Sequence, residues 1–106
     1  MDQETLFSEL GEKPSHHNKV VITVVGLDRI GIIASVTTVL AKHRINIEDI
    51  TQKILGEYFT MILIGDLSRC TSDLKTLKEE LVNAGEKIGV KVFVQHAEVF
   101  HAMHRI

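Results

Sequence analysis

The chain has 106 residues, a formal net charge of -2 and one cysteine, Cys70. This length suits one domain with a single core. The chain lacks the basic stripe or tail of a nucleic-acid-binding protein. It also lacks an apolar run approaching the roughly 20 residues of a membrane helix. A lone cysteine cannot form an intrachain disulfide or a CxxC metal site, and the N-terminus lacks the layout of a signal peptide, so we expect a cytoplasmic protein without nucleic-acid or membrane partners.

Residues 1–18 differ in pattern from the rest of the chain. A short apolar turn is followed there by a polar linker that contains Pro14, and neither part repeats an apolar period long enough for a packed element. We therefore expect an N-terminal extension or linker over residues 1–18 and a single domain over residues 19–106.

The domain begins with an almost unbroken β-branched run, which predicts a buried strand over residues 19–26. After the turn the apolar period changes from two to 3.6, which predicts a helix reaching about His43. Asp28 stands where a side-chain cap would help to start that helix. Its buried stripe is expected to comprise Ile32, Ile33, Val36, Val39 and Leu40.

Residues 45–55 and 57–65 are predicted to form a hairpin of two strands around Gly56. The apolar phase of the first strand slips between Ile47 and Ile50, and a β-bulge near Glu48-Asp49 would explain the slip.

Residues 73–88 carry leucines at spacings of three and four, which predicts a second helix with Ser72 as its cap. Gly89 ends this helix, and residues 90–97 alternate as a fourth strand. Residues 98–106 return to helical spacing, so we expect a short C-terminal helix.

The element order predicts an α+β fold of the ferredoxin-like βαββαβ type, with a four-stranded antiparallel sheet and both helices on one face. The strands nevertheless carry apolar residues on both faces. Because an exposed apolar face of several hundred Å2 is rare in monomers, we expect self-association as a homodimer or larger oligomer. One parity carries Val20, Ile22, Val24, Phe59, Met61 and Leu63, and the other carries Val21, Val25, Tyr58, Ile62 and Ile64.

The turn over residues 26–32 and the strand start over residues 45–50 together resemble the ACT domain, a small ferredoxin-like regulatory module that binds amino acids. The resemblance covers about residues 19–97, and a single unit of this kind is similar to the small stand-alone ACT proteins and to the ACT repeats of the glycine-cleavage-system regulator. It implies a non-enzymatic module without a catalytic residue or cofactor. We expect no metal site, because His96, His101 and His104 have no carboxylate or thiolate pattern beside them. Ile30 stands where many members of the family carry Pro.

In that family the ligand commonly sits between two ACT units, held by the first turn and the start of the second strand. The resemblance therefore implies an amino-acid site formed by Asp28, Arg29, Gly31 and Ile32 in the turn and by Asn46, Ile47 and Asp49 in the strand. Free N–H groups at a helix N-terminus favour a carboxylate, a glycine admits a ligand close to the backbone, and an aspartate can pair with an ammonium group.

Simpler roles stand beside these. Asp28 can be a helix cap alone, Gly31 a packing residue and Asn46 a local turn residue. A protein-interaction module without a small ligand, docking through residues 100–106 on a partner protein, is the alternative function. An acylphosphatase-like enzyme is a third, although Asp28 would place a negative charge in its phosphate cradle.

Overall fold

Strands and helices alternate in the predicted order in the computed structural model, which describes residues 18–99. The elements are β1 (Lys19–Leu27), α2 (Ile32–Lys42), β2 (Asn46–Leu55), β3 (Tyr58–Asp66), α3 (Leu74–Ile88) and β4 (Val90–His96). Residues 97–99 begin the predicted C-terminal helix. The rest of that helix and most of the predicted extension over residues 1–18 lie outside the described residues.

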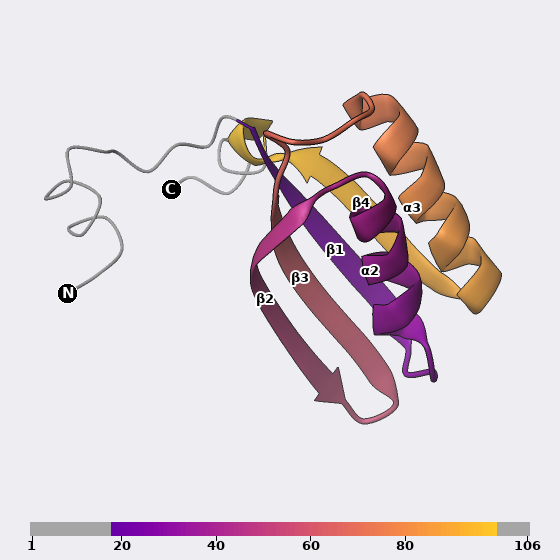
Figure 1. The fold of residues 1–106 in the computed structure, drawn as a ribbon. Coiled ribbons are helices and arrows are strands. Elements are labelled where there is room, and N and C mark those ends of the chain that lie inside the picture. Colours follow the sequence, from indigo (N-terminus) through magenta and orange to yellow (C-terminus); the bar gives the residue numbers. More distant parts are fainter. Residues whose placement is uncertain (1–17, 100–106) are drawn as a thin grey trace, which may run out of the picture.

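The four strands form one antiparallel sheet in the order β2-β3-β1-β4. Both helices cover the same face (Figure 1), which confirms the ferredoxin-like prediction. The core lies between this face and the helices, because one set of alternating side chains from each central strand points toward α2 and α3. Its fully buried large side chains include Ile22, Val24, Met61, Leu63, Leu77 and Leu81.

The predicted bulge is present in β2. Ile47 pairs with Gly65 and Asp49 with Ile64, so Glu48 is the extra residue. Because side chains alternate along a strand, the bulge brings Ile47, Ile50 and Ile54 to the helix-covered side of the sheet.

β2 is an edge strand, and every one of its residues is exposed. The tip of the hairpin of β2 and β3 extends past the first residues of α2 (Figure 1), so no helix covers the outer half of β2. The isoleucines of β2 are therefore on the helix side of the sheet without belonging to the core.

Ile33 in α2 and Ser72 before α3 do not have the roles that the sequence predicts for them. The apolar pattern places Ile33 in the buried stripe, but it is 39% exposed, because the face of α2 that meets the core is narrower than the apolar pattern. The sequence predicts Ser72 as the cap of α3, but Asp73 has this role, with its carboxylate accepting a 2.8 Å bond from the Thr76 N–H.

The sheet face opposite the helices is partly apolar, as the alternation predicts. Val21 is buried, while Val25, Leu27, Tyr58, Ile62 and Phe93 are exposed. Phe93 and Tyr58 are the most exposed of these, at 56% each. Self-association through this face or an edge strand stays a prediction.

Candidate functional site

The turn between β1 and α2 is held by backbone bonds rather than by a side-chain cap. Gly31 is the N-cap of α2, with a left-handed φ of 91° and no side-chain hydrogen bond. The prediction that Asp28 caps the helix is therefore wrong: its N–H donates a 2.8 Å bond to the Glu57 carbonyl at the β2–β3 hairpin tip, and its side chain is exposed.

This geometry leaves the start of α2 open to an anion. The first bond of the helix runs from the Ser35 N–H to the Gly31 carbonyl at 2.9 Å, so no helical carbonyl lies ahead of the first-turn N–H groups. A carboxylate placed there would be favoured both by these donors and by the helix dipole. No acidic side chain of the first turn occupies that place.

The remaining turn residues divide between surface and core. The Arg29 guanidinium extends over the α3–β4 turn, since a Cβ built on Gly89 would lie 3.4 Å from its Nε. Ile30 is 99% exposed, whereas Ile32 is 2% exposed and packs in the core. Ile32 can therefore serve a ligand only through its backbone N–H.

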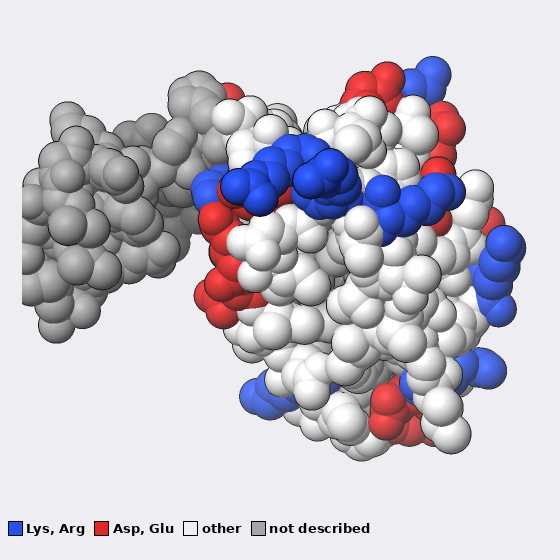
Figure 2. All heavy atoms as spheres, viewed as in Figure 1, with Lys and Arg blue, Asp and Glu red and all other residues white. Residues whose placement is uncertain are grey.

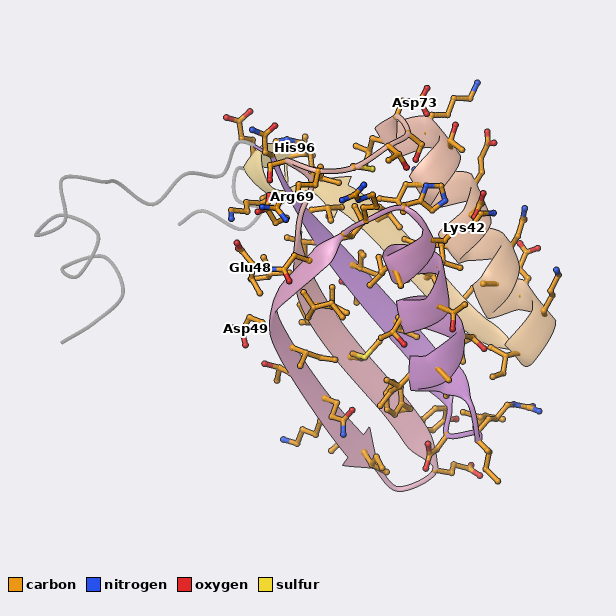
Figure 3. The ribbon with its side chains drawn as sticks, viewed as in Figure 1. Lys42, Glu48, Asp49, Arg69, Asp73 and His96 are labelled. Carbon is orange, nitrogen blue, oxygen red and sulfur yellow. The ribbon has the colours of Figure 1, made fainter. Side chains whose placement is uncertain are left out.

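The second predicted half of the site is the start of β2. Asn46, Ile47 and Asp49 are all exposed there. The Asp49 carboxylate accepts a 2.9 Å bond from the Ile50 N–H, and Glu48 forms an ion pair with Lys19. Figure 3 shows the Glu48 and Asp49 side chains at the outer margin of β2, pointing away from the helices.

A shallow groove of about 500 Å3 lies beside this strand start. It is lined by Thr37, Thr38, Leu40, Ala41, Ile45, Asn46 and Ile47. The groove contains two of the predicted residues, and it adds residues from the outward side of α2. The sequence analysis considered only the buried stripe of this helix and so missed its outward side. The available signal was the lack of any charged residue in α2 before Lys42.

One chain does not bring the two halves together. The turn precedes α2 and the start of β2 follows it (Figure 1). The 11 residues of α2 span about 16 Å at 1.5 Å per residue. A small ligand that touches both halves must therefore bind between two chains.

A polar cluster joins the end of α2 to α3. His43 is 5% exposed. Its Nδ1 contacts the Ser72 hydroxyl, and its Nε2 lies 2.9 Å from Oε2 of Glu80. The hydrogen bond from His43, followed by that from Lys42, lowers the pKa of the Glu80 carboxyl.

Bonds from the backbone N–H groups of Ser68 and Thr76 likewise lower the pKa values of Asp66 and Asp73. Cys70 is part-buried beside the cluster of His43, Ser72 and Glu80, and its thiol donates to the Ser72 carbonyl at 3.2 Å.

Two kinds of feature, a metal-binding cluster and a membrane-spanning helix, are absent from residues 18–99. This part of the chain contains no group of three or more His, Cys, Asp or Glu side chains that could hold a metal ion. Neither of its helices is long and apolar enough to span a membrane.

A four-stranded antiparallel sheet in the order β2-β3-β1-β4, with two helices on one face, is the arrangement of the ACT fold. The chain belongs to the ACT domain family, whose model matches residues 18–95. It is 49% identical over 88 residues to a UPF0237 protein of Methanopyrus kandleri, an alignment that covers 83% of this chain and 98% of that one.

Two solved structures place the chain among ACT proteins in the same way. An ACT domain protein from Streptococcus pneumoniae is 41% identical, with a TM-score of 0.69 over 81% of this chain and 97% of that chain. A candidate glycine cleavage system transcriptional repressor is 26% identical, with a TM-score of 0.63 over 73% of this chain and 44% of that chain. The resemblance to stand-alone ACT proteins and to this type of regulator is confirmed.

Proposed function

We propose that this protein is a non-enzymatic regulatory module that binds a free amino acid between two copies of the chain. The observation that carries the proposal is the placement of an open helix N-terminus and of the groove beside Asn46 at opposite ends of α2. A two-fold axis across the middle of α2 would set the turn of each copy against the groove of the other, so a dimer would contain two equivalent sites.

Each group in this proposed site has a defined chemical role. The ligand carboxylate takes the N–H groups of the first turn of α2, with Arg29 beside them. Gly31 leaves room for that approach, because the nearest atom to a Cβ built there is Ile88 Cδ1 at 3.6 Å. From the partner copy, Asp49 pairs with the ammonium group, and Asn46 binds polar atoms of the ligand. Such binding would regulate a partner protein only if the ligand favours one arrangement of the two copies over another.

A thermal-shift screen against the individual amino acids at millimolar concentration tests the proposal. A ligand present at about 100 times its Kd stabilises the native state by about 2.7 kcal/mol, which corresponds to a Tm rise of about 10–20 °C for a domain of this size. A selective rise is expected for one chemical class of amino acid. A panel with no shift would count against tight amino-acid binding by the native protein.

The site residues are tested separately from the ligand. Gly31→Val and Asn46→Ala should each abolish the ligand-induced shift. Asn83→Ala is the matched control, since Asn83 is exposed on α3, outside the proposed site, and undergoes the same chemical change. If both site variants keep the full shift, the site assignment is wrong even though the ligand is right.

A protein-interaction module without a small ligand is the second candidate function. The exposed Tyr58 and Phe93 on the uncovered sheet face favour it, because large aromatic side chains are enriched at protein interfaces. If no amino acid changed the Tm in the thermal-shift screen, this candidate function would be favoured. The acylphosphatase-like reading requires hydrolysis of an acyl phosphate, and we expect none, because the exposed Asp28 carboxylate would repel the phosphate.

A further inference from the structure

The outward side of α2 is unusual for an exposed helix surface. Ile33, Ala34, Thr38 and Ala41 are exposed on α2, and none of them is charged. Figure 2 shows the consequence: uncharged atoms fill the centre of this side of the molecule, while Lys, Arg, Asp and Glu gather around its margin. Helices that face water normally carry charged residues on that side, so this surface has the composition of a covered one.

Ile30 projects from one end of this surface. Its side chain is 99% exposed, although isoleucine is among the residue types most often found fully buried. The groove at the other end of α2 is floored by Leu40, Ile45 and Ile47 and rimmed by Ala41 and the two threonines. An apolar projection and a partly apolar groove therefore lie at opposite ends of α2, where they cannot reach each other within one chain.

Charges beside the projection and the groove are complementary. Asp28 lies two residues before Ile30, and Arg44 directly precedes Ile45 of the groove. Within residues 18–99 the ion pairs join Lys19 to Glu48 and Lys42 and His43 to Glu80. Asp28 and Arg44 take part in none of these pairs, so the acid beside the projection and the base beside the groove are both available.

The backbone of Arg44 has a defined conformation at the end of α2. Its backbone is left-handed, with a φ of 61°, and its N–H donates to the Ala41 carbonyl at 3.1 Å. This bond places Arg44 directly after α2, at the end of the groove that Ala41 and Ile45 line.

We propose that a second copy of this chain covers the surface, with Ile30 of each copy seated in the groove of the other and Asp28 facing Arg44. The proposal adds a specific contact to the dimer on which the proposed function rests, and it needs no ligand. Ile30 takes the apolar part of the groove, at Leu40 and Ile45, so the first-turn N–H groups, Arg29, Asn46 and Asp49 remain for the amino acid. The same two-fold axis forms both contacts at once, so the assembly closes as a dimer.

Disulfide cross-linking tests this arrangement directly. In a Cys70→Ser background, the double variant Ile30→Cys with Ala41→Cys should form a linked dimer on mild oxidation. A bond within one chain is excluded, because residues 32 and 41 alone are separated by about 13 Å of helix and a disulfide requires Cα atoms within about 7 Å. Ile30→Cys with Thr51→Cys is the matched control, since Thr51 pairs with Ile62 on the opposite sheet face, and we expect it to stay unlinked.

A charge reversal gives a second, independent measurement. Asp28→Arg and Arg44→Asp should each raise the dimer dissociation constant by about tenfold, since symmetry changes two exposed pairs at once, and the double reversal should restore it. Sedimentation of the unmodified chain as a monomer, linking of the control, or a dimer that never links through Ile30 and Ala41 would each overturn the proposal. A monomer would also overturn the proposed amino-acid site between two copies. In the other two cases, an amino-acid shift that persists would leave ligand binding intact and remove only this contact.

Discussion

Gly31 provides the sharpest prediction for the turn, because the effect of its backbone conformation can be separated there from the effect of steric contacts. Its φ of 91° is in the region that disfavours L side chains. A Cβ at this position would meet only Ile88 Cδ1, at 3.6 Å, which is an ordinary contact distance. The cost of Gly31→Ala should therefore come from the backbone alone, at about 1–2 kcal/mol, or a fall in Tm of about 4–16 °C.

Thermal unfolding of Gly31→Ala measures this cost, and Gly31→Asn tests its cause. Asparagine tolerates a left-handed backbone and is a good helix cap, so Gly31→Asn should lose less stability than Gly31→Ala. Gly56→Ala is the control, since Gly56 has a φ of 64° and a Cβ built on it would meet no atom within 4 Å. Both alanine variants should lose similar stability, but only Gly31→Ala should also weaken amino-acid binding.

Two results would refute this reasoning. If Gly31→Ala left the Tm unchanged, the left-handed N-cap would be wrong, because the backbone would have found an unstrained form. If Gly31→Asn were as unstable as Gly31→Ala, a steric contact rather than φ would dominate.

The remaining predictions concern α3. The pKa of Glu80 is lowered in the folded state, chiefly by the hydrogen bond from His43. Its contribution to stability is therefore present above its unfolded pKa and is lost as the pH falls through the folded pKa. Glu80→Gln should flatten the acid side of a stability-pH profile, while Glu79→Gln should leave the profile unchanged. Gly85→Ala would place a Cβ 2.5 Å from Val92 Cγ2. Denaturant unfolding should therefore show that the free energy of unfolding falls by about 1–3 kcal/mol, despite the better helix propensity of alanine. Adding Val92→Ala should recover part of this free energy, and full additivity of the two changes would contradict this account.

The order and types of the elements could be predicted from the sequence because each has a strong local signal. The β-branched run of β1 and the leucine spacing of α3 reflect periods of two and 3.6 that follow from burial on one face. The bulge at Glu48 was also predictable, since the slip between Ile47 and Ile50 breaks the strand period.

The errors arose where several residues could satisfy the same local need. Ser72 and Asp73 are adjacent cap residues with similar preferences, and only the contact with His43 directs Ser72 elsewhere. Asp28 has the right chemistry for a cap, but the left-handed Gly31 starts the helix three residues later. The lack of charged residues in α2 can be seen in the sequence. The groove beside Asn46 cannot, because its shape depends on how the end of α2 packs against the start of β2.

The backbone bond from the Asp28 N–H to the Glu57 carbonyl has a mechanical consequence. It fastens the β1–α2 turn to the tip of the β2–β3 hairpin (Figure 1), so neither segment can shift without straining the other. A molecule that steadies the turn would thereby reduce motion at the hairpin tip, where Leu55 and Tyr58 are exposed. A partner protein could sense occupancy at that tip, at a distance from the bound molecule, without any large change of shape.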